Sequence, residues 1–269
     1  MPDKIYIARH GFRLNWITTV WKSPTGLPRD PPLAAYGEAQ AEELAKHFLS
    51  LPEDQRPTAI FSSPYYRCIQ TAQPTSQHLN IPLYIEHGLS EWYSPVAPST
   101  GLHPRPSSAQ SLTTYFPSIN TTWSPVYYPT RKGETIEELH DRIDEFLQGF
   151  YVALIERLPE EQRKRPLFVS HAATVIALAR SLVGDRELPL KVGCATLSEF
   201  VPKEGAWKAL ELASGKHLAK GADREWGFEY VEVDKGRVVE DPGEGENGEK
   251  DEPLGLQIKI NPPGLSSSL

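Results

Sequence analysis

Short apolar runs alternate along the chain with longer stretches in which apolar residues recur every three or four positions. The short runs predict β-strands over residues 4–8, 58–62, 83–85 and 166–170. The longer stretches predict helices over residues 37–49, 63–78, 135–158 and 172–183. Strands that alternate with helices are typical of a mainly parallel sheet covered on both faces. The pattern therefore predicts an α/β fold with three layers, α/β/α.

Further apolar runs follow the last of these helices. Residues 195–201, 207–213 and 227–233 are predicted as strands, antiparallel and towards an edge of the sheet. Residues 254–260 are predicted to dock as a small terminal strand.

Two helix starts carry local capping signals. Ser63 is predicted as an N-cap with Pro64 at the first helical position, which places Arg67 in the first turns of that helix and near the sheet edge. Thr135 and Glu138 are predicted to form a capping box at the start of the long helix.

Two stretches interrupt the alternation. Residues 16–29 extend the loop after the first strand, and we interpret them as a lid. Residues 94–133 are rich in Pro, Ser, Thr and Tyr, and a loop of this length inside a compact domain indicates a functional or partly helical segment. We interpret this segment as an insertion or lid with a short helix over residues 107–116.

The end of the chain has a different composition. Residues 240–253 form an acidic, Gly-rich run that we expect to be solvated and flexible. We therefore expect one domain over residues 1–235 and an acidic flexible linker and C-terminal tail over residues 236–269.

Two histidines stand directly after predicted strands. His10 lies in Arg9-His10-Gly11 after the first strand, and His171 lies in Ser170-His171-Ala172 after the strand over residues 166–170. Ligands of open α/β sheets bind at the carboxyl ends of strands. An imidazole nitrogen can attack phosphorus and carry a phosphoryl group if cationic donors hold the phosphate oxygens. Because Arg9 and Arg13 flank His10, the sequence predicts a phosphate pocket at this edge of the sheet.

Composition narrows the class of protein. The net charge is −7, from 28 basic and 35 acidic residues. The chain therefore lacks the overall excess of positive charge that is typical of proteins that bind nucleic acid directly. The two cysteines form no disulfide framework or metal-type spacing, which favours a reducing compartment. No run is long enough for a membrane span, so we expect a cytoplasmic or nuclear protein without membrane attachment. No Walker-type lysine loop and no carboxylate cluster with metal spacing is present, so we expect neither a metal nor another cofactor.

Five motif blocks in order resemble the histidine phosphatase superfamily, in its phosphoglycerate mutase-like branch, over residues 4–185. The blocks are Arg9-His10-Gly11, Asp30-Pro31-Pro32-Leu33 with Gly37 and Gln40-Ala41, Ser62-Ser63-Pro64 with Arg67 and Gln70-Thr71-Ala72, Leu89-Ser90-Glu91, and Ser170-His171-Ala172. Phe12-Arg13 after the first block is similar to an offshoot that contains phosphatase domains of signalling proteins and a tau-type subunit of a fungal transcription factor.

The resemblance implies a role for each matching residue. It implies that His10 is a nucleophile that becomes phosphorylated, and that Glu91 is the proton donor. It further implies that the phosphoryl oxygens are bound by Arg9, Arg13, Arg67 and His171. Guanidinium groups suit this task because their rigid fork of donors matches phosphate. A proton donor needs a raised pKa, which we expect from partial burial of Glu91, and nearby Glu86 competes for the same role.

The insertion holds the candidates for substrate choice. In this superfamily the segment after the proton donor commonly shapes specificity, so the resemblance implies His103, Arg105, Tyr127, Tyr128 and Arg131 as specificity residues. Trp16, in the loop after the nucleophile, is a further candidate.

The sequence leaves several functions open. The principal hypothesis is a metal-independent phosphatase that hydrolyses a phosphomonoester, either a small phosphorylated molecule or phosphotyrosine, through a phosphohistidine on His10. A phosphoglycerate-type mutase would use the same residues. The alternative from another class is a histidine-phosphatase-like assembly subunit of the RNA polymerase III transcription factor, which binds a protein partner.

Overall fold

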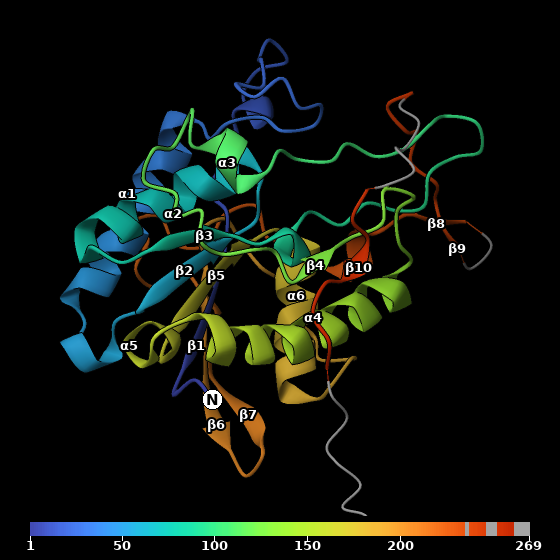
Figure 1. Ribbon diagram of the computed structural model, residues 1–269. Coiled ribbons are helices and arrows are strands. Elements are labelled where there is room, and N and C mark those ends of the chain that lie inside the picture. Colours follow the sequence, from blue (N-terminus) through green and yellow to red (C-terminus); the bar gives the residue numbers. More distant parts are fainter. Residues whose placement is uncertain (235–236, 246–251, 261–269) are drawn as a thin grey trace, which may run out of the picture.

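The centre of the protein is a six-stranded sheet with the order β3-β2-β5-β1-β6-β7 (Figure 1). The computed structural model describes residues 1–234, 237–245 and 252–260. The strands of the central sheet are β1 (Ile5–Arg9), β2 (Ala59–Ser62), β3 (Leu83–Ile85), β5 (Pro166–Ser170), β6 (Leu197–Lys203) and β7 (Ala206–Ser214). The first four are parallel to one another, whereas β6 is antiparallel to both β1 and β7, and β7 lies at one edge. The predicted α/β class and the antiparallel edge are confirmed.

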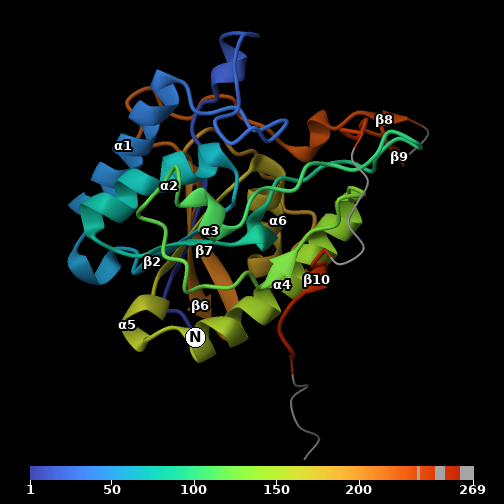
Figure 2. The same ribbon diagram turned by 45° about the horizontal axis from the view of Figure 1, so that its top comes forward.

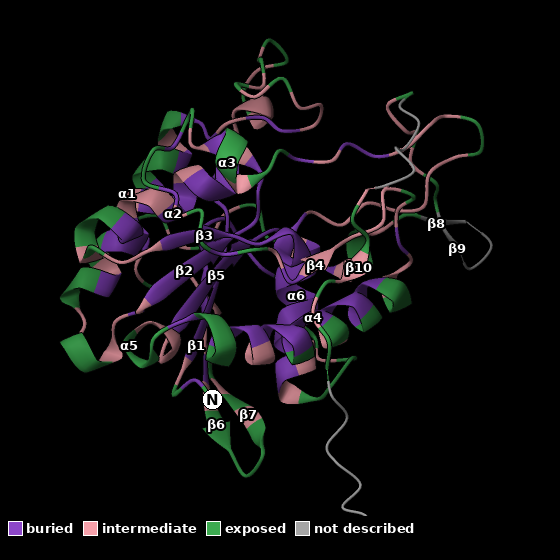
Figure 3. Cartoon of the chain, in the orientation of Figure 1, coloured by how far each residue is buried: buried purple, intermediate pink, exposed green. Residues whose placement is uncertain are grey.

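Helices cover both faces of this sheet. They are α1 (Ala35–Ser50) and α2 (Tyr66–Leu79) on one face, with α4 (Ile136–Arg157) and α6 (Ala172–Val183) on the other. Alternate residues of β1 divide between the two resulting cores: Tyr6 and Ala8 pack with α1 and α2, and Ile5 and Ile7 pack with α4 and α6. Because β1 is buried on both faces, its sequence is a continuous apolar run rather than an alternating one (Figure 3).

The start of α2 differs from the prediction. The N-cap is Tyr65 rather than Ser63, and Asp30 Oδ2 accepts the Tyr66 backbone N–H at 2.8 Å. The Ser63 hydroxyl instead lies 2.7 Å from Nε2 of His171 and accepts the Tyr65 N–H at 3.5 Å. The capping box of Thr135 and Glu138 at α4 is present as predicted.

The predictions for shorter elements have mixed outcomes. The predicted strand over residues 227–233 is wrong: a 3-10 helix (Phe228–Tyr230) precedes the two-residue strand β8 (Val233–Asp234), which pairs with β9 (Arg237–Val238). The helix expected over residues 107–116 is reduced to α3 (Ala109–Leu112). The predicted terminal strand is confirmed in its core, where β10 (Gly255–Leu256) pairs with β4 (Tyr127–Tyr128). The remaining short elements are α5 (Glu160–Arg163) and the 3-10 helices Leu14–Trp16, Glu53–Gln55 and His87–Leu89.

The described parts of the acidic tail lie against the insertion. Val96 forms a bridge with Asp241, so the chain near residue 241 runs beside residues 95–102 (Figure 2). Arg29 pairs with Asp241 and with Glu244, at 3.0 and 2.6 Å. Glu252 pairs with Arg131 at 2.7 Å. These carboxylates are therefore used in contacts with the rest of the chain.

No helix in the described part of the chain is both long and apolar enough to cross a membrane.

Candidate active site

The two strand-end histidines meet at one edge of the sheet. β1 and β5 are adjacent and parallel, with Arg9 opposite Ser170 in the register. His10 and His171 therefore leave the sheet side by side, and their ring centroids lie 5.4 Å apart. The sequence prediction that these histidines share an edge is confirmed.

His10 is held as a neutral imidazole. Its Nδ1 lies 2.8 Å from the carbonyl oxygen of Gly11, so Nδ1 carries the proton and the lone pair remains on Nε2. The side chain is almost completely buried. Burial, reinforced by the charges of Arg67 and Arg9, keeps the pKa of His10 well below 6.5. A neutral Nε2 next to cationic groups has the protonation state that a nucleophile requires.

Side chains from both neighbouring helices fix the loop that carries His10. Thr71 Oγ1 accepts the Gly11 N–H at 3.0 Å, and Gln40 Oε1 accepts the Phe12 N–H at 2.9 Å. Gly37 lies so close that a Cβ atom there would stand 2.2 Å from the Phe12 carbonyl oxygen. The approach of α1 to this loop explains why the motif has glycine at position 37.

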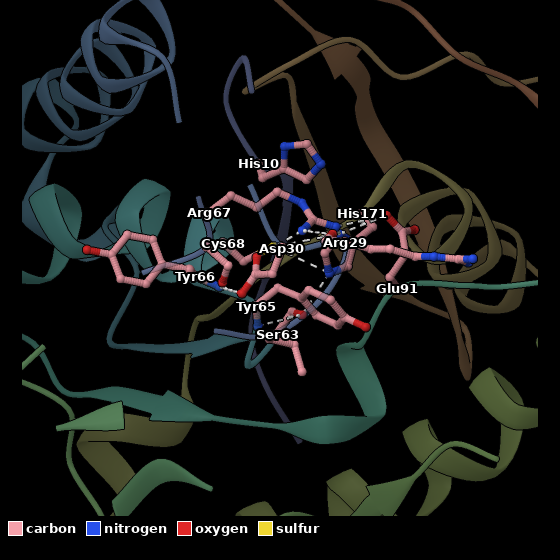
Figure 4. Close-up of polar contacts among 12 residues, drawn as sticks. His10, Arg29, Asp30, Ser63, Tyr65, Tyr66, Arg67, Cys68, Glu91 and His171 are labelled. Carbon is pink, nitrogen blue, oxygen red and sulfur yellow. Dashed lines mark hydrogen bonds and ion pairs between the residues drawn. The ribbon is translucent and has the colours of Figure 1, made fainter. Parts of the chain in front are cut away.

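Arg67 is the centre of a buried polar network (Figure 4). Its side chain is 1% exposed, and it pairs with Asp30 at 3.0 Å and with Glu91 at 3.1 Å. The same Nη2 that contacts Glu91 also lies 3.0 Å from Nδ1 of His171. Burial lowers the pKa of Arg67, but Asp30 and Glu91 outweigh burial and raise it. Arg67 is therefore a permanent cation behind the pocket.

His171 is bound through both ring nitrogens. Nδ1 lies 3.0 Å from Nη2 of Arg67 and 3.2 Å from Oε2 of Glu91, and Nε2 lies 2.7 Å from the Ser63 hydroxyl. Burial lowers the pKa of His171 to about 4. Arg67, His171 and Glu91 therefore form one contiguous buried cluster.

Glu91 does not have the raised pKa that we expected. Burial raises its pKa, but His171, Arg67 and Arg13 together outweigh burial and lower it well below 4.5. Glu91 is therefore ionised before a substrate binds, because a carboxylate beside fixed cations favours the charged form.

Glu86, the competing carboxyl, occupies a structural position. It is completely buried and accepts hydrogen bonds from the Gly88 N–H, the Trp123 Nε1–H and the Val126 N–H at 2.8 to 2.9 Å. Burial raises its pKa to about 7. Glu86 anchors the insertion, whereas Glu91 lines the pocket of His10.

The pocket itself has a volume of about 230 Å³ and combines three sources of positive potential. Arg9 and Arg13 line it beside His10 and Glu91, and Ala172 and Ala173 bring the N-terminal backbone of α6 to its wall. The N-terminus of a helix attracts anions through its unpaired N–H groups and its dipole. Trp92, Tyr93 and Trp226 form the remaining walls of the pocket.

Arg9 and Arg13 are held in place by neighbouring groups. Nη1 of Arg9 donates to the carbonyl oxygens of Val192 and Arg224, at 2.7 and 2.6 Å. Arg13 lies over the ring of Trp16 at 4.3 Å, and burial, with the charge of Arg67, lowers its pKa to about 10. Within the described residues, the buried Nε atoms of both arginines and of Arg67 have no hydrogen-bond partner. Unpaired buried donors are unfavourable, so an anion that reaches them would be stabilised.

The specificity candidates of the insertion lie elsewhere. Arg105 and Arg131 line a separate cavity of about 30 Å³, which also includes Glu91, and both pair with Glu252. Tyr127 and Tyr128 form β4, and the Tyr128 ring lies 4.7 Å from that of His87. Trp16, by contrast, lies near the nucleophile, with 6.4 Å between its ring centroid and that of His10.

Sequence reasoning did not identify three residues of this region. Asp30 and Ser63 belong to recognised motif blocks, but neither was assigned a contact within the site. Trp226 lies 53 residues beyond Ala173 and carries no motif; only the fold brings it to the pocket. Among the described residues, no group of three His, Cys, Asp or Glu side chains is arranged to hold a metal ion.

Comparison with known proteins agrees with this geometry. Residues 5–214 match the histidine phosphatase superfamily (branch 1). The chain is 43% identical over 187 residues to the transcription factor tau 55 kDa subunit of Saccharomyces cerevisiae, covering 68% of this chain and 41% of that protein. It is 25% identical over 249 residues to the ecdysteroid-phosphate phosphatase of Drosophila melanogaster, covering 77% of this chain and 32% of that protein. The matched parts thus span 41% and 32% of the length of these two relatives.

Solved structures share the fold. The ecdysone phosphate phosphatase of Bombix mori, crystallised with tungstate, superposes with a TM-score of 0.60 at 18% identity, over 78% of this chain and 92% of that chain.

Proposed function

Because the chain belongs to branch 1 of the histidine phosphatase superfamily, we propose that it hydrolyses a phosphomonoester through a phosphohistidine formed on His10, without a metal ion. The observation that carries this proposal is the neutral Nε2 of His10 in a pocket lined by Arg9, Arg13 and the N-terminus of α6. Phosphatases among its relatives and structural neighbours support the same reaction class.

The reaction takes two steps with these residues. Nε2 of His10 attacks phosphorus, and the bond between phosphorus and the ester oxygen breaks while the three arginines stabilise the transferred group. Water then attacks the phosphohistidine, Glu91 accepts a proton from that water, and the phosphorus–nitrogen bond breaks. Inorganic phosphate leaves with the proton that Glu91 accepted, so Glu91 is ionised again and His10 returns to its neutral form.

Because Glu91 is ionised, the proton that the leaving oxygen needs in the first step has to come from the substrate. The leaving alcohol needs a proton, and Glu91 has none to give before a substrate binds. A phosphomonoester monoanion brings one proton with it, and the negative charge of the bound phosphate raises the pKa of Glu91 by opposing the effect of Arg67 and Arg13. Glu91 then passes this proton to the leaving oxygen.

This proton balance predicts the pH dependence with an alkyl phosphomonoester. The second pKa of such phosphates is about 6, so the reactive monoanion disappears above it, and kcat/KM should fall about tenfold per pH unit above pH ~7. No decrease is expected as the pH falls from ~7 through the ordinary histidine pKa of about 6.5, because the pKa of His10 lies well below that value. Initial rates over this range, with enzyme returned to the starting pH as a stability control, test this. A kcat/KM that rises with pH would contradict it.

The phosphohistidine is tested by trapping. Purified protein is mixed with p-nitrophenyl phosphate and a metal chelator, quenched in base within the first turnover, and digested for mass spectrometry. We expect chelator-resistant release of p-nitrophenol and an acid-labile phosphoryl group on the peptide that contains His10. A phosphoryl group on another residue, or activity lost with the chelator, would overturn the mechanism. Transfer of the phosphoryl group from His10 to a hydroxyl of a second substrate molecule would identify a mutase.

A second candidate function rests on the relative from Saccharomyces cerevisiae. The sequence identity of 43% between this chain and the tau 55 kDa subunit supports an assembly role as a subunit of a transcription factor. In that role the chain would bind a protein partner in the nucleus. Affinity purification of the tagged protein from its own cells tests this role. Co-purification of a stoichiometric partner that is unaffected by His10→Ala would favour assembly as a function separate from hydrolysis.

A further inference from the structure

A second cavity adjoins the pocket of His10. Its volume is about 300 Å³, and it shares the aromatic walls Trp92, Tyr93 and Trp226 with that pocket. Its outer part is lined by segments that follow the last strand of the central sheet, including Val231, Glu232, Val239 and Glu240. The two cavities are therefore adjacent, and the same three aromatic side chains line both.

The shared aromatic walls are firmly attached to the phosphate pocket. Trp226 and Val192 exchange two backbone hydrogen bonds, at 2.9 and 3.1 Å, and the Val192 carbonyl also accepts from Arg9. The indole of Trp92 donates to the Glu134 carbonyl at 2.8 Å. Phe228 packs against both indoles, with ring centroids 6.2 Å from Trp92 and 5.4 Å from Trp226. Two indoles held in this way form a preorganised apolar surface for a flat group.

The rim of this cavity is acidic. Asp241 contributes to the lining, but its charge is balanced by Arg29 at 3.0 Å. Glu232 and Glu240 are exposed, and neither forms an ion pair with any residue that the structure describes. The apolar walls therefore end at two carboxylates without an ion-pair partner in the described part of the chain, although the adjoining phosphate pocket is strongly positive.

We propose that this second cavity is the leaving-group subsite, and that it selects phosphomonoesters with a flat apolar group next to the ester oxygen and a positive charge beyond it. The proposal rests on the proposed phosphatase function. A ring between Trp92 and Trp226 buries apolar area, and a cation at its far end is attracted by Glu232 and Glu240. An anionic end group is repelled by the same carboxylates, so the subsite discriminates against substrates with a distal negative charge.

Two aryl phosphates that differ only in a distal charge test this subsite. They are 4-(aminomethyl)phenyl phosphate, which is cationic at its far end, and 4-(carboxymethyl)phenyl phosphate, which is anionic. At about 0.05 M salt we expect kcat/KM to favour the cationic ester by about five- to tenfold, and this preference should shrink towards one at about 0.5 M salt. The double variant Glu232→Gln/Glu240→Gln should reduce the preference at low salt to less than about twofold.

A matched double variant controls for a general change in charge. Glu156→Gln/Glu161→Gln removes two exposed carboxylates near α5, at the opposite end of the molecule, and should keep the preference of the parent protein (Figure 1). Hydrolysis of p-nitrophenyl phosphate, which carries neither charge, reports the proposed function separately. If that ester is hydrolysed but the preference is absent, or persists in Glu232→Gln/Glu240→Gln, the subsite proposal is wrong. If the parent protein hydrolyses none of the three esters, the proposed function fails as well.

Discussion

Replacing His10 by alanine should abolish phosphomonoester hydrolysis, with a loss in kcat of at least about 10,000-fold. The loss is expected to be this large because Nε2 of His10 forms the bond to phosphorus in the proposed reaction, and no other imidazole of the described residues lines the pocket. Of the groups nearest to it, His171 uses both ring nitrogens in contacts with Ser63 and Arg67. The measurement is release of phosphate from p-nitrophenyl phosphate in the presence of a chelator.

The fold should survive this substitution. His10 is a buried neutral ring whose side chain donates one hydrogen bond, to the carbonyl oxygen of Gly11. Alanine therefore removes a desolvated polar group and leaves no buried charge. A thermal unfolding midpoint within a few degrees of the parent protein is expected. His47→Asn serves as the control, because His47 lies on α1 outside the pocket and should keep full activity. More than a tenth of the parent activity in His10→Ala would rule out His10 as the nucleophile.

The parts of the site that were predictable from the sequence are those fixed by strand topology. His10 and His171 each follow a short buried run, and parallel strands bring their carboxyl ends to the same edge. Local periodicity was enough to locate α1, α4 and α6, because each carries an apolar stripe at helical spacing. These predictions depend only on neighbours in the sequence and on one general rule of topology.

The parts that were not predictable depend on contacts between distant residues. Ser63 has the residue type and position of an N-cap, but its hydroxyl binds His171, which lies 108 positions later. The apolar run over residues 227–233 has a strand-like composition, yet Phe228 packs on Trp92 and the local chain forms a 3-10 helix instead. Tertiary packing overrides local propensity at both places.

The pKa of Glu91 could not be predicted for the same reason. The neighbouring apolar residues in the sequence indicated burial, and burial alone raises a carboxyl pKa. The structure adds Arg67 from α2, His171 from the end of β5 and Arg13 from the loop after β1, and these groups reverse the sign of the shift. The protonation state therefore belongs to the assembled site and not to any single segment.

The second large effect is expected for Arg67, whose charge we expect to stabilise the fold and, in the proposed reaction, the transferred phosphoryl group. Arg67→Met should lower the free energy of unfolding by about 3–5 kcal/mol, because it leaves Asp30 as an unpaired buried carboxylate. Activity should fall at least about 1,000-fold, since the permanent cation behind the pocket is lost. Urea denaturation and initial rates with p-nitrophenyl phosphate measure the two effects.

The stability loss of Arg67→Met should also depend on pH. Burial already raises the pKa of Asp30 even with Arg67 beside it, and removal of Arg67 raises this pKa further above the unfolded value of about 3.9. A carboxyl whose pKa is raised in the folded state favours folding when it is protonated, so stability falls as pH increases through that raised pKa. The variant should therefore be closer to the parent protein in stability at pH ~5 than at pH ~8.

A double variant separates the two roles of Arg67. Asp30→Asn in the Arg67→Met background removes the unpaired charge while the amide oxygen still accepts the Tyr66 N–H, so most of the lost stability should return. Activity should not return, because the phosphoryl group still lacks the cation that faces Glu91 and His171. If the double variant regains both stability and activity, Arg67 acts only as a structural partner of Asp30. If it regains neither, the buried charge of Asp30 is not the reason that Arg67→Met is unstable.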